Sequence, residues 1–253
     1  MSQARYDSTR LPGKVLKNIL NKPLLWYHIK RLEEVKTPNK IIIATTTSDS
    51  NKPIVDLAKN MNIDYFIGSE IDVLDRYYQA AKNFNGDIIV RVTSDCPLTE
   101  PSLIDEGLKI FLNGDYDYVS NGHPPTFPDG YDIEIFSFQA LKSSWSEAKL
   151  PSEREHVTPY IWKHTEEFSL FNIENNVDLS SFRLTVDTPE DFILISKIIE
   201  EFHINWTEIR LKDVMNYLRK NPDLLKINAQ YQYNEGYLKS LEKDKKFLEG
   251  KLI

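Results

Sequence analysis

The chain has 253 residues and is acidic, with 31 basic against 38 acidic side chains and a net charge of −7. This charge argues against nonspecific binding of nucleic acid, which needs a broad basic face. No stretch approaches the roughly 20 apolar residues of a membrane-spanning helix, and the N-terminus is too polar for a signal peptide. The single cysteine, Cys96, excludes an internal disulfide bond. We therefore expect a cytoplasmic protein that does not insert into membranes.

The apolar pattern predicts strands and helices that alternate along the chain. Short runs rich in β-branched residues predict strands at 40–46, 63–67, 87–93, 116–120, 132–136, 168–173 and 182–186. Apolar residues at helical spacing predict helices at 16–32 (interrupted near Pro23), 53–60, 73–83, 101–112, 138–148, 151–164, 193–202 and 211–218. Ser152 and Glu155 form a capping-box pattern at the start of one of them. This order indicates an α/β fold.

The two ends of the chain carry separate expectations. Only Met1 and Ser2 precede the polar segment that begins at Gln3, so we expect either a truncated first strand or a start that lies further upstream. After residue 231 the chain becomes polar and rich in Lys and Glu. We therefore divide it into a main domain, residues 1–227, and a C-terminal extension, residues 228–253, that packs on the body or on a partner subunit.

Residues 3–14, QARYDSTRLPGK, form a basic loop on an acidic protein. Such a loop suits one small anionic ligand better than a long polyanion. Pro12 and Gly13 turn the backbone and let it pass close to a ligand, while Arg10 and Lys14 can surround phosphate oxygens. The loop lacks the P-loop pattern. A solvated basic loop without a ligand is the alternative that spacing alone leaves open.

Two acidic residues stand where a predicted strand gives way to the next segment. Asp95 follows the strand at 87–93 and precedes a proline turn, and Asp187 follows the strand at 182–186 and precedes Thr188, a predicted helix cap. Open α/β sheets bind ligands at the carboxyl ends of their strands. A solvated loop carboxylate is the alternative for Asp95.

Three segments together resemble the sugar nucleotidyltransferases with a GT-A-type, Rossmann-like fold. Among them, the chain is most similar to the cytidylyltransferases of acidic sugars and to the spore-coat polysaccharide (SpsF-like) proteins. The matching segments are 94–98 (SDCPL), 186–191 (VDTPED) and, in the first loop, Ala4, Arg5, Ser8, Arg10, Leu11, Pro12, Gly13 and Lys14. The resemblance implies a mixed, mostly parallel sheet flanked by helices, and a homodimer is common among such relatives.

The resemblance also implies roles for individual residues. The loop would hold a nucleoside triphosphate, and Asp95 and Asp187 would bind a divalent cation, for which Mg²⁺ is the natural choice because it prefers carboxylate and phosphate oxygens. Arg76 is a candidate nucleotide contact, or else forms a surface salt bridge to Asp72 or Asp75. The substrate candidates are Asp132, Glu134 and His156, although the two acids also suit the polar face of an edge strand and the histidine suits a packed helix.

We therefore expect an enzyme that joins CMP from CTP to an acidic sugar for surface polysaccharide and releases pyrophosphate, with Arg10 and Lys14 neutralising the leaving phosphates. A GT-A glycosyltransferase is one alternative, but the chain lacks an Asp-x-Asp motif at a strand end, since Asp115-Tyr116-Asp117 opens a strand instead. A non-catalytic nucleotide-binding paralogue is the other. The sequence does not name the sugar.

Overall fold

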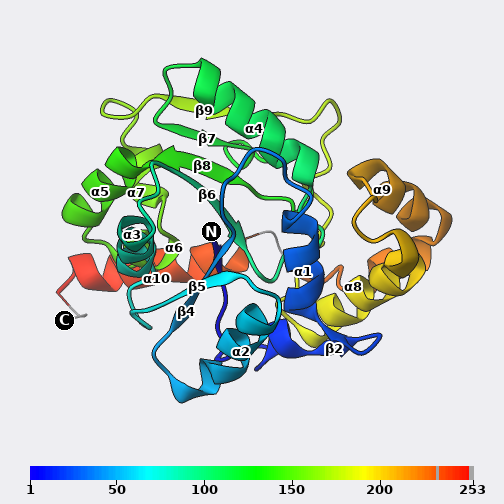
Figure 1. Ribbon diagram of the computed structural model, residues 1–253. Helices are drawn as coiled ribbons and strands as arrows, with labels where there is room; N and C mark the ends of the chain where they lie inside the picture. Colours follow the sequence, from blue (N-terminus) through cyan, green and yellow to red (C-terminus); the bar gives the residue numbers. More distant parts are fainter. Residues whose placement is uncertain (232–233, 251–253) are drawn as a thin grey trace.

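Figure 1 shows the computed structural model of the chain, which describes residues 1–231 and 234–250. Seven strands form one sheet in the order β5-β4-β1-β6-β8-β7-β9, and only β8 runs antiparallel to its neighbours. The strands are β1 (Ser2–Gln3), β4 (Ile42–Thr46), β5 (Asp64–Gly68), β6 (Ile88–Thr93), β7 (Tyr118–Ser120), β8 (Glu134–Ser137) and β9 (Leu170–Asn172). The prediction of a mixed, mostly parallel sheet is confirmed.

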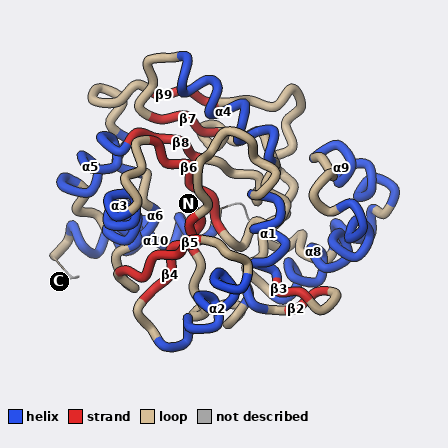
Figure 2. The backbone as a smooth tube through the Cα atoms, in the orientation of Figure 1, coloured by secondary structure: helices blue, strands red, loops and turns tan. Residues whose placement is uncertain are grey.

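Helices flank this sheet, as Figure 2 shows. They are α1 (Leu24–Leu32), α2 (Lys52–Asn60), α3 (Val73–Asn83), α4 (Pro101–Asn113), α5 (Phe138–Glu147), α6 (Pro151–His156), α7 (Pro159–Lys163), α8 (Pro189–Phe202), α9 (Leu211–Lys220) and α10 (Glu235–Leu248). Strand β6 buries both faces, because Ile89 packs with α3 and α5 while Val92 packs with α4. None of the helices in the described part of the chain is long and apolar enough to cross a membrane.

The first strand has two residues although it lies at the centre of the sheet, between β4 and β6. Ser2 is paired with Ile43 on one side and with Val92 on the other. Next to Met1, the flanking strands and the residues that precede them line a cavity of about 400 Å³. The Met1 amino group donates to the Val90 carbonyl at 2.6 Å, and burial lowers its pKa to about 5. The first strand is therefore present, and it is short.

The helix predicted at 16–32 is wrong in its first half. A short 3₁₀ helix (Lys14–Leu16) leads into a hairpin of β2 (Asn18–Ile19) and β3 (Lys22–Pro23), and the helix begins only at Leu24. Leu20 and Asn21 form the hairpin turn with φ angles of 47° and 65°. Positive φ at both turn residues is what a type I′ hairpin turn requires, and a leucine in the first position conceals that signal.

The helix predicted at 151–164 is divided in two. Val157 has a φ of 75° between α6 and α7, and Pro159, the first residue of α7, has no N–H group with which to continue the hydrogen bonds of α6. The predicted capping box is also wrong: Glu153, not Glu155, accepts hydrogen bonds from the backbone N–H groups of Lys149 and Leu150.

Two predicted strands differ from the structure at their acid-bearing ends. The strand at 132–136 begins only at Glu134, so Asp132 lies before it. Residues 182–186 are extended but form no regular strand; Arg183 makes an isolated bridge to Asp129, and Val186 N–H donates to the Asp95 carbonyl at 2.9 Å. This segment lies in the loop region between β9 and α8, where isolated bonds rather than a ladder satisfy its backbone.

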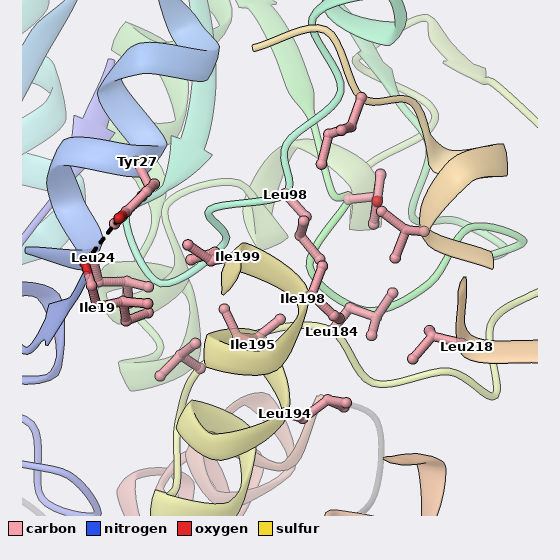
Figure 3. Close-up of a cluster of buried hydrophobic side chains, with 14 of the residues drawn as sticks. Ile19, Leu24, Tyr27, Leu98, Leu184, Leu194, Ile195, Ile198, Ile199 and Leu218 are labelled. Carbon is pink, nitrogen blue, oxygen red and sulfur yellow. Dashed lines mark hydrogen bonds between the residues drawn. The ribbon is translucent and has the colours of Figure 1, made fainter. Parts of the chain in front are cut away.

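A hydrophobic cluster positions the two acidic segments relative to each other. Leu98, three residues after Asp95, and Leu184, three residues before Asp187, both belong to the cluster that surrounds Ile198 of α8, as Figure 3 shows. All three of these apolar side chains are fully buried. Side chains packed into one core cannot move apart without opening a cavity, so this cluster fixes the distance between the acids.

The C-terminal segment packs on the body of the same chain. Asp244 of α10 accepts hydrogen bonds from the backbone N–H and the hydroxyl of Ser152 in α6, at 2.8 and 2.6 Å. Residues 232–233 and 251–253, which belong to the predicted extension, lie outside the described residues.

Candidate active site

The basic loop after β1 is folded tightly on itself. The Tyr6 carbonyl accepts hydrogen bonds from the backbone N–H groups of Ser8 and Gly13, both at 2.8 Å. Gly13 has a φ of 67°, and a Cβ atom there would lie 2.9 Å from the Tyr6 ring, so only glycine fits this turn without strain. Arg5 is exposed and Ser8 is half-buried. The turn directs Lys14, which follows it, toward the carboxyl ends of the central strands.

Lys14 brings the two predicted acids together. Its Nζ atom lies 2.6 Å from Asp95 Oδ2 and 2.7 Å from Asp187 Oδ1. Arg10 adds a second cation, with its Nη2 atom 2.9 Å from Asp187 Oδ2. Side chains that are 81 and 173 residues from Lys14 in sequence thus converge on one ammonium group. The two carboxylates form a binding site for positive charge beside the basic loop.

The electrostatics of this group favour the charged forms. Burial by itself would raise the pKa of Asp95, but the charge and hydrogen bond of Lys14 outweigh it and hold that pKa well below its usual range. Burial would likewise lower the pKa of Lys14, and Asp95 and Asp187 overcome this effect, so the pKa of Lys14 is raised. The positive charge of Lys14 is what keeps the buried Asp95 ionised.

Arg183 holds Asp187 from the other side. Its guanidinium contacts both carboxylate oxygens of the fully buried Asp191 at 3.0 Å, and it also lies 3.1 Å from Asp129 and from Asp187. Asp191 in turn accepts hydrogen bonds from the backbone N–H groups of Asp187 and Thr188. Sequence reasoning missed Arg183 and Asp129. The spacing of Arg183 four residues before Asp187 was the available signal.

A cavity of about 300 Å³ opens from Asp95 and Asp187 toward β8 and α6. Of the predicted substrate residues, Asp132, Glu134 and His156 all line it. Glu134 is already well satisfied, because it pairs with Arg91 and accepts hydrogen bonds from the hydroxyls of Tyr118 and Thr158. Burial would raise the pKa of Glu134, but the Arg91 charge and these hydrogen bonds lower it. Glu134 therefore builds the cavity wall as an ionised side chain.

Arg76 does not line this cavity. Its side chain is buried, and Nη1 donates to the Ser69 carbonyl at 2.7 Å. Asp72, the suggested partner in a surface salt bridge, pairs instead with Arg154 and caps α3 by accepting from the Asp75 N–H. The surface salt bridge is thus wrong, because the arginine stem packs beneath the surface. Its contact with nucleotide stays a prediction.

Glu235, the first residue of α10, reaches the basic loop. Its Oε2 atom lies 2.7 Å from Arg10 Nη1, so Arg10 is shared between Glu235 and Asp187. Residues 234–237 also line the cavity. Sequence reasoning placed no site residue in this segment, because its polar and Lys/Glu-rich composition has no catalytic pattern.

A comparison with known protein families decides the assignment. Residues 2–248 match the family described as Cytidylyltransferase. The chain belongs to this cytidylyltransferase family. The match supports nucleotidyl transfer over the glycosyltransferase alternative, and it covers the basic loop, both acids and α10 together.

Individual relatives agree with the family match. A solved structure of a cytidylyltransferase from Leptospira borgpetersenii is 35% identical, with a TM-score of 0.85, and the alignment covers 91% of this chain and 97% of that one. The spore coat polysaccharide biosynthesis protein SpsF of Bacillus subtilis is 28% identical over 87% of this chain and 93% of its own length. A 3-deoxy-manno-octulosonate cytidylyltransferase from Lawsonia intracellularis is 32% identical over 44% of each chain. The predicted resemblance is confirmed.

Proposed function

We propose that this cytidylyltransferase transfers CMP from CTP to a sugar and releases pyrophosphate, with a sugar acid for a surface polysaccharide as the first acceptor class to test. One observation carries the proposal: Lys14 Nζ bridges Asp95 and Asp187 at 2.6 and 2.7 Å beside the basic loop. The acceptor class is supported by the relatives that act on 3-deoxy-manno-octulosonate and in spore coat polysaccharide synthesis.

The two carboxylates suit Mg²⁺. Their oxygens are the hard ligands that this ion prefers, and they already surround a cation in the form of the Lys14 ammonium. Among residues 1–231 and 234–250, no group of three or more His, Cys, Asp or Glu side chains is placed to hold a metal ion. Substrate phosphate and water would therefore complete the coordination, as is usual for Mg²⁺. When bound, the ion would neutralise charge on the α-phosphate and make a nearby hydroxyl more acidic.

The remaining chemistry follows from the side chains of this chain. Arg10 and Lys14 bind the triphosphate and stabilise the negative charge that develops on pyrophosphate as it leaves. A sugar hydroxyl oxygen in the cavity attacks the α-phosphorus, the bond from that phosphorus to the β-phosphate oxygen breaks, and the hydroxyl proton passes to water. Arg183 keeps Asp187 oriented during this step. Catalysis then depends mainly on positioning and charge stabilisation.

The test is a screen for pyrophosphate release. The four nucleoside triphosphates are combined, with Mg²⁺, with several sugar acids and with neutral sugars. We expect release with CTP and a sugar acid, and a loss of at least about 100-fold in the Asp95→Asn variant, because a charge-stabilising ligand is removed. Asp223→Asn, which changes an exposed carboxylate paired with Lys226, is the matched control. Undiminished turnover in Asp95→Asn contradicts the proposed role of Asp95, and CTP binding without release favours the non-catalytic paralogue.

A further inference from the structure

Aromatic rings gather in one part of the cavity lining. Trp162 of α7 and Tyr237 of α10 have ring centroids 5.7 Å apart, His123 lies 4.4 Å from Trp162, and His156 lies 5.3 Å from Tyr237. All four rings line the cavity, and Trp162 and Tyr237 remain half-buried. Large aromatic side chains at a concave, partly open wall are typical of a ligand pocket.

The helix that carries Tyr237 is fixed to the body by polar contacts, most of them buried. Ser240, one turn further along α10, is buried and contacts both Glu155 Oε2 and His156 Nε2 at 2.9 Å. Lys243 pairs with Glu155 at 2.8 Å, and the buried Asp244 accepts from Ser152. These contacts hold Tyr237 in place, so the aromatic wall is preformed.

His156 contacts the same helix. Its Nε2 atom lies 2.9 Å from the Ser240 hydroxyl, which also contacts Glu155 and the Gly236 carbonyl. Burial lowers the pKa of His156 to about 4, so the ring is neutral near pH 7. The imidazole therefore adds no positive charge to the cavity wall.

We propose that Trp162 and Tyr237 form the subsite for a pyranose ring of the acceptor, closed by α10 of the same chain. The flat side of a pyranose presents C–H groups, which aromatic faces attract because they carry negative partial charge. Ring hydroxyls then meet polar groups of the cavity lining, among them His156 and Thr158. An open-chain polyol has no flat side and gains less from such a wall. The inference rests on the proposed function, and it names the ring-binding residues and the shape of the acceptor.

The position of α10 places this subsite next to the reacting phosphates. Glu235 contacts Arg10 of the basic loop, and Tyr237, two residues later, belongs to the aromatic group. The first turn of α10 thus links the basic loop to the aromatic residues. Tyr237 and Trp162 become determinants of acceptor specificity.

The experiment measures KM for the acceptor and for CTP in separate titrations. Three probes are used: 3-deoxy-manno-octulosonate and glucose 1-phosphate, which form rings, and 2-C-methyl-D-erythritol 4-phosphate, which is open-chain. For the better ring substrate, we expect Tyr237→Ala and Trp162→Ala each to raise the acceptor KM about 5- to 10-fold, the range expected for loss of one aromatic contact. The CTP KM should change less than about 2-fold. Tyr237→Phe, which keeps the ring, should behave as wild type.

Leu238→Ala is the matched control, because Leu238 adjoins Tyr237 on α10 but is 50% exposed. Unchanged acceptor KM values in both alanine variants, or a preference for the open-chain probe, overturn the inference while leaving the proposed function intact. Absence of CTP binding and of pyrophosphate release contradicts the proposed function instead. In that case calorimetry with the three probes still tests the subsite. If a ring-forming probe binds to the wild type and not to Tyr237→Ala, the subsite is supported. If neither ring-forming probe binds to the wild type, the inference is overturned.

Discussion

Replacing Lys14 by methionine tests whether Asp95 and Asp187 form a cation site. The substitution keeps the length of the side chain and removes the charge that lies between the two carboxylates. Removing one partner of a buried ion pair costs about 3–5 kcal/mol, whereas a surface pair contributes about 0–1 kcal/mol. The Lys14 side chain is 11% exposed and both acids are 23% exposed, so the site lies nearer the buried case. We expect the free energy of unfolding to fall by about 2–4 kcal/mol.

Magnesium should restore part of this stability. With the ammonium removed, the two carboxylates can take up Mg²⁺, and for a Kd on the order of 1 mM, 10 mM Mg²⁺ contributes about 1.4 kcal/mol. The wild type should gain less, because Lys14 already occupies the space between the acids. Urea unfolding with and without MgCl₂ measures both effects as shifts of the midpoint.

Two controls make this prediction specific. Lys17→Met changes an exposed lysine three residues away and should leave both stability and the Mg²⁺ response unchanged. Lys14→Met combined with Asp187→Asn should lose the Mg²⁺ response, because one carboxylate is gone. The reasoning is refuted if Lys14→Met is as stable as wild type, or if Mg²⁺ stabilises all these variants equally.

Three further predictions concern other parts of the molecule. Burial lowers the pKa of the fully buried His28 to about 4, below the unfolded value of 6.5, so the free energy of unfolding should fall by up to about 3 kcal/mol as pH falls from about 6.5 to 4. Urea unfolding at several pH values should show a weaker pH dependence of this free energy in His28→Asn, and an equal pH dependence in both proteins contradicts the prediction. Glu235→Gln removes an ion pair with Arg10 in which both side chains are about a quarter exposed, so Arg10 is freer to bind phosphate. Calorimetry should show CTP binding up to about 5-fold tighter. Weaker binding would show that Glu235 assists the nucleotide. Three β-branched residues added ahead of Met1 should fill the adjacent cavity and stabilise the protein by about 2 kcal/mol or more, which raises Tm by several degrees. An unchanged Tm would show that the added residues do not fill the cavity.

The parts that sequence predicted well depend on local signals. The β-branched run that ends at Thr93, followed by a turn with proline, is sufficient to place Asp95 at the carboxyl end of a buried strand. The first loop was recognisable because Pro12 and Gly13 fix its backbone while Arg10 and Lys14 supply charge within a few residues. The family match over residues 2–248 agrees with both.

The parts that sequence predicted wrongly depend on backbone geometry that residue types conceal. Leu20 and Val157 both adopt positive φ, which is uncommon for leucine and a genuine outlier for a β-branched residue such as valine. The first stands in a hairpin turn that reads as helix, and the second breaks a helix that reads as continuous. Helical spacing of apolar residues carries no information on these φ angles, so it could not reveal either break.

The missed site residues depend on contacts between distant segments. Arg183 becomes a site residue only through its contacts with Asp129, Asp187 and Asp191 in the folded chain. Glu235 lies 225 residues from Arg10 in sequence. The spacing of Arg183 four residues before Asp187 is the one local signal among these contacts, and the sequence holds none for the contact between Glu235 and Arg10.

The most direct test of the central claim is to locate the metal in crystals grown with CTP, using Mn²⁺ in place of Mg²⁺. An anomalous difference map shows the position of the ion independently of the chemistry. Our account predicts a peak at coordination distance from carboxylate oxygens of both Asp95 and Asp187, with the Lys14 ammonium moved from between them to the phosphates. A peak at any other site, or bound CTP with Lys14 still bridging the two acids, would contradict it.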